Sequence, residues 1–235
     1  LNKIKNKNIL SYGENKKADY QIKKIKYNYD STTFDLSFKD KNKKYKNIKN
    51  INIKLLGKHN ALNAAAAFIV CLNLGANINI AKKSLKNFSG VQRRMTKVFS
   101  KNKNDFFDDY AHHPTEIKVV LDGVSNVYNG YEKICIFQPH RISRLKDLKK
   151  EFTYAFKDAD KVILFPIYTA GEKIKIGFSY LNFAKKIIKN SKVKLFLIDD
   201  KFQLAKYVKC NIYGKKIVIG MGAGSISTWM RELPK

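Results

Sequence analysis

The 235-residue chain is short of several residue types, and each shortage excludes a class of protein. Four prolines and 12 glycines exclude collagen-like and proline-rich low-complexity chains. Only three cysteines are present, Cys71, Cys135 and Cys210, and they form no CxxC pair. This pattern predicts buried thiols in a reducing compartment, and therefore a cytoplasmic protein, rather than a disulfide framework.

Long apolar runs are also lacking. The longest, residues 61–76, contains Asn63 and Asn73 and is too short and too alanine-rich to indicate a membrane span. The first ten residues, LNKIKNKNIL, have no apolar core of the signal-peptide kind. The chain does not start with Met, so we expect it to begin inside a longer protein.

Acidic residues are few, 19 against 47 lysines and arginines, and the formal net charge is +28. Such a charge favours a polyanionic partner, whether nucleic acid, an anionic membrane or a phosphate-rich substrate. Lysine far outnumbers arginine and is spread along the whole chain, which favours a solvated surface over a specific nucleic-acid interface. The basic–aromatic interleaving of RRM and OB surfaces is lacking. We therefore expect no membrane and no specific nucleic-acid partner, and keep a basic nucleic-acid-binding α/β module as the alternative.

The first third of the chain carries strand signals and then helix signals. Residues 18–56 alternate apolar and polar side chains, with a turn at Asp30 and Ser31. Residues 59–75 predict a buried helix that ends at Gly75, and residues 78–88 predict a short amphipathic helix. Residues 90–94 follow as a junction, which divides the chain into domains at 1–90 and 91–235.

After the junction, apolar strands alternate with helices. This order predicts a doubly wound, mostly parallel sheet of the α/β class, in which ligands bind at the carboxyl ends of the strands. The expected strands are 105–111, 133–140, 161–167, 192–200 and 216–225, with helices from 114, at 145–156, 180–189 and 202–208, and a last short one. Polar clusters fall at four of the strand ends: 108–113, 138–141, 169–172 and 222–225.

The first polar cluster combines Asp109 with His112 and His113. These residues could form a metal site, a base with its orienting partner, or a nucleotide clamp. Metal ions in proteins usually take three or four ligands, and adjacent histidines at a strand end point in different directions. We therefore predict no metal ligands here, and the alternative is a carboxylate that stabilises a helix start.

The second cluster places three potential cations, His140, Arg141 and Arg144, within five residues. Guanidinium groups bind carboxylates and phosphates through paired hydrogen bonds. A surface turn that begins a helix is the alternative, but the rigid Gln138-Pro139 exit from the strand favours a positioned site.

Two further motifs are less specific. The glycine turn at 220–224 resembles a dinucleotide fingerprint loosely, but it lies on the last strand with too little chain after it for an NAD-binding unit. No Walker A loop precedes Lys58 and His59. Asn60 and Asn63 share a helical face, where an amide could pair with an adenine edge or could cap the helix; both interpretations stay open.

Taken in order, the motifs GKHNALNAAAA, FSGVQRRM, DDYAHHPTEI, FQPHRISR, YTAGE and MGAGSI resemble the Mur ligase family. They are more similar to its alanine-adding members than to its muropeptide-recycling members. The resemblance implies that residues 1–90 are the β-hairpin and helical tail of a central ATPase domain. It implies that residues 91–235 are a Rossmann-like C-terminal domain. The family's P-loop, its Mg²⁺ ligands and its UDP-sugar domain are not in the chain.

The resemblance also implies a reaction and residue roles. The expected reaction is ATP-dependent amide formation in peptidoglycan synthesis, in which L-alanine joins UDP-N-acetylmuramate through an acyl phosphate, with Mg²⁺ held mainly by the missing N-terminal half. That half is the expected partner, and the chain alone is expected to be inactive. The implied cofactor-binding residues are His59, Asn60 and Asn63 at the adenine, Arg94 at the phosphates and Asp109 at the ribose. The implied catalytic residues are His112 near the phosphates, and His140, Arg141 and Arg144 at the reacting carboxylates.

Overall fold

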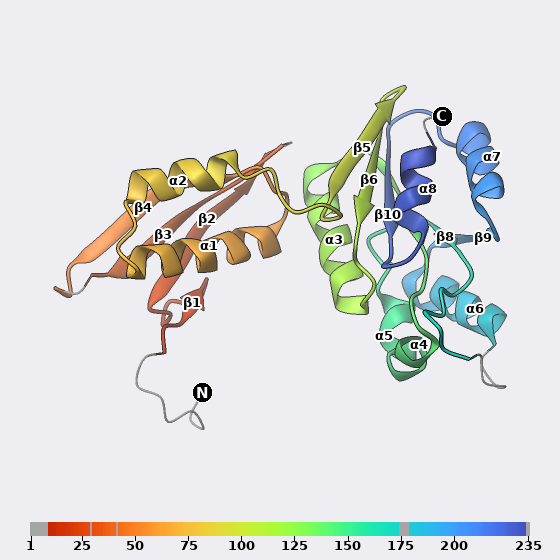
Figure 1. The fold of residues 1–235 in the computed structure, drawn as a ribbon, viewed down its shortest axis with the longest axis horizontal. Coiled ribbons are helices and arrows are strands. Elements are labelled where there is room, and N and C mark those ends of the chain that lie inside the picture. The colour runs from red at the N-terminus through yellow and green to blue at the C-terminus, as the bar shows by residue number, and fades with distance from the viewer. Residues whose placement is uncertain (1–8, 29, 41, 174–178, 234–235) are drawn as a thin grey trace. The chain divides into compact units, whose positions relative to one another are not determined.

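The computed structural model describes residues 9–28, 30–40, 42–173 and 179–233. The chain divides into two compact units, Leu1–Ser89 and Gly90–Lys235, which we describe separately (Figure 1). Within the described residues, no helix is long and apolar enough to cross a membrane.

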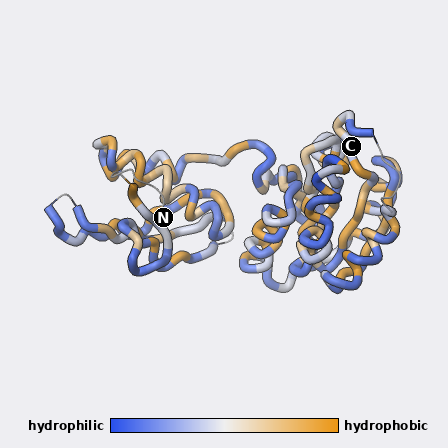
Figure 2. Tube along the Cα trace, turned by 90° about the horizontal axis from the view of Figure 1, so that it is seen from below, coloured by the Kyte–Doolittle hydropathy of each residue, from blue (hydrophilic) through white to orange (hydrophobic). Residues whose placement is uncertain are grey.

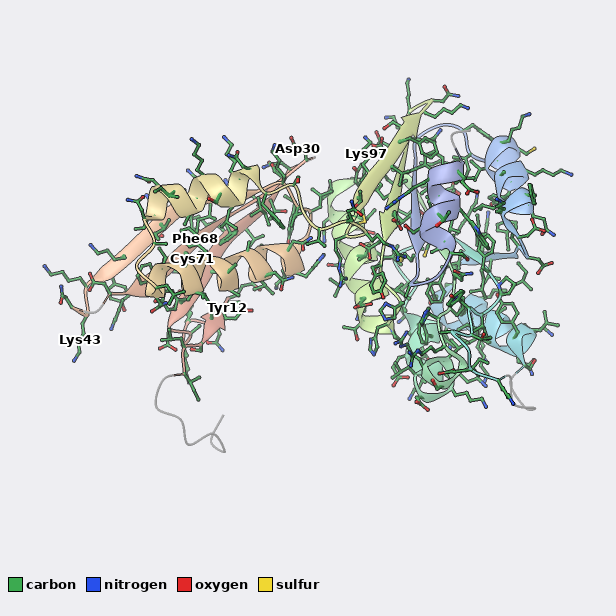
Figure 3. The ribbon with its side chains drawn as sticks, in the orientation of Figure 1. Tyr12, Asp30, Lys43, Phe68, Cys71 and Lys97 are labelled. Carbon is green, nitrogen blue, oxygen red and sulfur yellow. The ribbon has the colours of Figure 1, made fainter. Side chains whose placement is uncertain are left out.

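Unit 1 is a four-stranded sheet with two helices on one face (Figure 1). Its strands are β1 (Tyr12–Gly13), β2 (Tyr20–Tyr27), β3 (Thr32–Lys39) and β4 (Tyr45–Ile53), in that order, with β2, β3 and β4 antiparallel. Its helices are α1 (Lys58–Asn73) and α2 (Ile78–Asn87). Alternate residues of the strands face the helices, and Phe68 of α1, labelled in Figure 3, is buried in this core.

The predicted glycine stop of α1 is confirmed. Gly75 has φ +88°, a left-handed conformation that residues with a Cβ rarely adopt. Its N–H donates to the Leu72 carbonyl, and the next N–H, that of Ala76, donates to the Cys71 carbonyl. This pair of bonds satisfies carbonyls that the end of the helix would otherwise leave free.

Unit 2 is a six-stranded sheet with helices on both faces, which confirms the predicted doubly wound α/β fold (Figure 1). Five strands are parallel, and the edge strand β5 runs antiparallel to β6. The strand order is β5 (Thr96–Lys101), β6 (Asn104–Asp109), β10 (Lys216–Met221), β7 (Glu132–Phe137), β8 (Lys161–Leu164) and β9 (Lys194–Leu197). The helices are α3 (Pro114–Val127), α4 (Ile142–Asp147), α5 (Lys149–Tyr154), α6 (Tyr180–Ser191), α7 (Lys201–Asn211) and α8 (Ile226–Glu232).

Strand β7 shows why this sheet needs two helical layers. Successive strand residues point to opposite faces, and β7 is apolar at both sets of positions. Ile134 and Ile136 join the cluster that α7 and α8 cover, whereas Phe137 packs against Phe152 and Phe156 on the other face. Each such side chain contributes roughly 1.5–3 kcal/mol when fully buried. In Figure 2 the middle of the unit is accordingly coloured hydrophobic.

Three details differ from the sequence predictions. The single helix expected at 145–156 is wrong: α4 and α5 are separate, because Leu148 between them has φ −111° and ψ 25°. Strand β5 was not anticipated, and a bulge between Lys97 and Phe99 breaks its alternation. The predicted burial of the thiols is right for Cys135 and wrong for Cys71 and Cys210, which are exposed because they lie on outward faces of α1 and α7.

Candidate functional site

The carboxyl ends of the central strands of unit 2 lie in register. Asp109, Met221 and Phe137 end β6, β10 and β7 as direct neighbours, and Leu164 of β8 pairs with Phe137. The polar clusters that follow these strands are therefore brought together, as the sequence predicts. The rings of His112 and His140 lie 6.0 Å apart, although they come from different strand ends.

Arginine marks this edge of the sheet. The chain contains five arginines, and all of them lie at the carboxyl ends of the strands or on a helix that contacts them. Lysine covers the rest of the surface. Four of the five are Arg93, Arg94, Arg141 and Arg144, and the fifth, Arg231 of α8, lies 3.7 Å from the carboxylate of Asp108.

Arg94, the predicted phosphate ligand, is exposed in the segment that leads into β5. Its guanidinium lies 6.0 Å from the centre of the Tyr110 ring, and that of Arg93 lies 4.7 Å from the same ring. Arg93 was not anticipated from the sequence. The scarcity of arginine in a lysine-rich chain is the signal that could have indicated it.

The Asp109 carboxylate is buried and turned inward. Its oxygens accept hydrogen bonds from the backbone N–H groups of Met95 and Ala111, each at 2.8 Å. Burial raises the pKa of Asp109 to about 6, although these two bonds oppose the shift. In this structure the carboxylate fixes the backbone around Arg94, and its contact with a ribose stays a prediction.

The two adjacent histidines diverge. His113 caps α3, because its Nδ1 accepts the Thr115 N–H. His112 instead faces His140, and its Nδ1 lies 2.8 Å from the Tyr110 carbonyl oxygen. A carbonyl accepts but does not donate, so Nδ1 carries the proton and Nε2 is left for a ligand.

Glu116 holds the backbone of both histidines. Its carboxylate accepts the N–H groups of His112 and His113 at 3.0 and 3.2 Å. Burial alone would raise the pKa of Glu116, but these bonds and the His112 imidazole outweigh it and lower the pKa. Glu116 therefore stays ionised and fixes the start of α3.

The cluster after β7 places its three basic side chains, those of His140, Arg141 and Arg144, in different surroundings. The His140 ring stacks on Tyr168 at 5.3 Å, and its Nδ1 is buried without a hydrogen-bond partner among the described residues. Burial lowers the pKa of His140, and the charges of Arg144, His112 and Arg141 lower it further, so the ring is neutral at neutral pH.

The two arginines of this cluster differ in exposure and in contacts. Arg144 Nη1 donates back to the His140 carbonyl at 3.2 Å. Arg141 is exposed, has φ +69° and stands before the first residue of α4. Glu172 holds this turn through the Ser143 hydroxyl and N–H, at 2.6 and 3.0 Å, and hydrogen bonds from Ser143 keep the pKa of Glu172 below its usual range.

The glycines of the turn after β10 allow close packing of neighbouring segments. Gly222 has φ +148°, and a Cβ there would lie 2.8 Å from the Gln138 carbonyl oxygen. A Cβ on Gly224 would lie 2.6 Å from Gln138 Oε1 and 2.9 Å from Tyr168 Cγ. The turn therefore lets Gln138 and Tyr168 approach, and a dinucleotide is not needed to explain its glycines.

The predicted adenine ligands lie in unit 1. His59, Asn60 and Asn63 occupy the first two turns of α1, and Asn63 is exposed. The Asn60 amide donates to the Leu56 carbonyl at 2.8 Å, which leaves its amide oxygen for another partner. Their contact with adenine stays a prediction.

Space for a ligand exists at the carboxyl edge. A cavity of about 390 Å³ is lined by residues that follow β7 and β8, among them Gln138, Tyr168 and Thr169. Among the described residues, no group of three or more His, Cys, Asp or Glu side chains is arranged to hold a metal ion.

Comparisons with known proteins identify the family of the chain. Residues 93–224 match the Mur ligase glutamate ligase domain, and residues 1–71 match the Mur ligase middle domain. The chain is 57% identical over 235 residues to the UDP-N-acetylmuramate–L-alanine ligase of Pelagibacter ubique, covering all of this chain and 51% of that protein. It is 36% identical to the ligase of the same name from Bartonella bacilliformis, covering 97% of this chain and 48% of that one.

Solved structures show the same fold. The crystal structure of UDP-N-acetylmuramate-alanine ligase MurC from Thermotoga maritima superimposes with a TM-score of 0.76 at 24% identity, over 96% of this chain and 47% of that one. MurF from Acinetobacter baumannii gives a TM-score of 0.68 at 19% identity, over 95% of this chain and 46% of that one. The chain spans about half the length of the relatives it matches. With a domain model that covers more than half of its residues, the chain belongs to the Mur ligase family.

Proposed function

We propose that the chain is the C-terminal half of an ATP-dependent ligase that joins L-alanine to UDP-N-acetylmuramate in cytoplasmic peptidoglycan synthesis. Residues 1–90 would complete the central ATPase domain, and residues 91–235 would form the C-terminal domain. The observation that carries the proposal is the gathering of four of the five arginines at the carboxyl edge of the sheet, with the fifth, Arg231 of α8, 3.7 Å from Asp108 near that edge. Relatives that carry this ligase name, up to 57% identical, support the substrate assignment.

The reaction would proceed in two balanced steps. A carboxylate oxygen of the sugar's lactyl group attacks the γ-phosphorus of ATP, which forms an acyl phosphate and releases ADP. The L-alanine amine then attacks the acyl carbon, which forms the amide and releases phosphate and a proton. Both steps develop negative charge on phosphate oxygens, so positioning and charge neutralisation dominate the catalysis.

The residues of this chain would supply part of that neutralisation. Arg94 and His112 would contact the phosphates, and the exposed Arg141 guanidinium would bind a carboxylate through paired N–H groups. His140, neutral at neutral pH, would lie beside Arg144 at the reacting groups. His59, Asn60 and Asn63 would contact the adenine, and Asp109 the ribose.

Mg²⁺ would neutralise the phosphates when bound. By the resemblance to the Mur ligase family, its ligands would come mainly from the half of the enzyme that this chain lacks relative to its relatives. That half is the partner this chain needs for turnover, because domain closure would assemble the site.

A fusion protein tests the proposal. The N-terminal half of the Pelagibacter ubique relative is joined to this chain, and phosphate release is measured with ATP, Mg²⁺ and UDP-N-acetylmuramate. We expect release that depends on L-alanine, and none from the chain alone. Release that requires a peptide instead of L-alanine would favour a muropeptide-recycling ligase, and no release with either would contradict the assignment.

A further inference from the structure

The segment Arg93–Met95 has an unusual backbone. Arg93 and Met95 have φ +61° and +46°, a conformation that costs residues with a Cβ about 1 kcal/mol or more each. Two hydrogen bonds to the end of β6 hold it: the Tyr110 N–H donates to the Arg93 carbonyl at 2.7 Å, and the Met95 N–H donates to Asp109 at 2.8 Å. Arg94 stands between these two left-handed residues and is exposed.

The Arg93 side chain points inward, unlike that of Arg94. Its guanidinium donates to the Gly222 carbonyl, covers the Tyr110 ring at 4.7 Å and lies 3.7 Å from Asp108. It thus connects the segment before β5 to the segments that follow β6 and β10. With 23% of its side chain exposed and these contacts made, Arg93 is poorly placed to bind substrate itself.

Asp108 explains why an arginine is needed at this position. Its side chain is 1% exposed, it accepts a hydrogen bond from the Ser227 hydroxyl, and its other oxygen has no hydrogen-bond partner among the described residues. A buried carboxylate without a nearby cation is strongly unfavourable. Among the described residues, Arg93 and the half-exposed Arg231 lie near it, each at 3.7 Å.

We propose that Arg93 is a positioning residue for the ligase reaction, acting through Arg94. Its contacts with Asp108, Tyr110 and Gly222 hold the strained segment, and the segment directs Arg94 toward the phosphates. This inference rests on the proposed function for its catalytic consequence. The structural part of the inference, that the Arg93 side chain holds the backbone of residues 93–95 in place, does not depend on the reaction.

A double-mutant cycle in the fusion protein tests the catalytic step. Arg93→Ala is expected to raise the KM for ATP and lower kcat/KM about 30-fold, with Arg93→Lys giving little rescue because an ammonium cannot make the planar contacts. In an Arg94→Ala background, Arg93→Ala should change kcat/KM less than about twofold, because its effect passes through Arg94. An undiminished effect in that background would overturn the proposal.

Hydrogen exchange in the 235-residue chain tests the structural step without any activity. We expect the amides of Met95 and Tyr110 to exchange at least tenfold faster in Arg93→Ala. The control is Lys97→Ala on β5 (Figure 3), which removes a cation 2.6 Å from the buried Asp105 of the same sheet and should leave these amides unchanged. Unchanged exchange in Arg93→Ala, or equal acceleration in both variants, would overturn the proposal. An inactive fusion with accelerated exchange would contradict the proposed function and leave the positioning intact.

Discussion

The two edges of the parallel sheet in unit 2 both carry positive charge, but of different kinds. At the amino edge a cavity of about 1180 Å³ is lined by Lys133, Lys157, Lys192 and Lys194. Two acids pair with lysines of this edge: Asp160 lies 3.4 Å from Lys133, and Glu132 pairs with Lys161 and Lys216. The Glu132 pairs are partly buried, and both lysines lower the pKa of Glu132.

At the carboxyl edge Asp108 lies 3.7 Å from both Arg93 and Arg231, whereas three other acids bind nearby backbone or hydroxyl groups. Asp109 and Glu116 accept backbone N–H groups, and Glu172 accepts the N–H and hydroxyl of Ser143. Among the described residues, none of these three carboxylates forms a salt bridge with Arg94 or Arg141, although the charge of Arg94 lowers the pKa of Glu116 and that of Arg141 lowers the pKa of Glu172. The two edges therefore differ in the kind of cation they carry, which is arginine and histidine at the carboxyl edge and lysine at the amino edge.

The largest expected effect tests this comparison with one substitution at each edge. Arg141 and Lys192 both have left-handed backbones, φ +69° and +57°. Glycine relieves that strain, so both Arg141→Gly and Lys192→Gly should keep or raise the free energy of unfolding, by up to about 1 kcal/mol. In the fusion protein we expect Arg141→Gly to lower kcat/KM at least 100-fold and Lys192→Gly to change it less than twofold. Equal activities of the two variants would contradict the assignment of the functional site to the carboxyl edge.

A second prediction concerns packing. Gly224→Ala places a Cβ 2.6 Å from Gln138 Oε1, so it should lower the free energy of unfolding by about 2 kcal/mol and displace Tyr168 from His140. The matched change at the amino edge is Gly130→Ala, where a Cβ meets nothing within 4 Å and only φ +78° opposes it. It should cost about 1 kcal/mol. Urea unfolding compares the two variants, and a larger loss for Gly130→Ala would contradict the packing account.

A third prediction concerns pH. The pKa of Asp109 rises to about 6 in the folded chain from an ordinary value near 3.8, so the folded state binds this proton more tightly than the unfolded chain does. Its contribution to stability is therefore lost as the pH rises from about 4 to 6. Asp109→Asn removes this titration. The free energy of unfolding of the variant minus that of the unsubstituted chain should therefore rise by roughly 2 kcal/mol from pH 4 to pH 7.5. Urea unfolding at both pH values measures this, and a pH-independent difference would show that Asp109 does not titrate in this range.

The smallest expected effect is at His140. Its pKa lies below 6.5 because of burial and the neighbouring charges of Arg144, His112 and Arg141. An NMR titration should place its midpoint below that of a free imidazole, and Arg144→Met should move the midpoint upward. A midpoint at or above 6.5 would mean that the ring is exposed or paired with an acid.

Much of this arrangement follows from the sequence. Apolar strand runs such as residues 133–137 predict a parallel sheet, and the polar residues after them then have to meet at one edge, as His112 and His140 do. The glycine stop of α1 could be read from Gly75 alone. These features could be predicted because they depend on local periodicity and on a general rule for parallel sheets.

The features that the sequence does not predict depend largely on contacts between segments that are distant in sequence. The local sequence does not distinguish the inward Arg93 from the exposed Arg94. The inward orientation of Arg93 depends on its contacts with Asp108, Tyr110 and Gly222. The hairpin into β6 turns at Asn102 and Lys103, both left-handed, where a glycine would have marked the turn. The break between α4 and α5 at Leu148 likewise has no proline or glycine from which it could be predicted.

The most direct test of the central claim is to map ATP binding on the 235-residue chain by NMR. With ATP at millimolar concentration, we predict amide shifts at Arg94, His112 and Arg141, and no shifts at Lys133, Lys157 or Lys192. Added salt would weaken ATP binding at either edge, so the test depends on where the shifts lie rather than on their size. Shifts concentrated at the lysines of the amino edge would contradict the assignment of the anion site to the carboxyl edge.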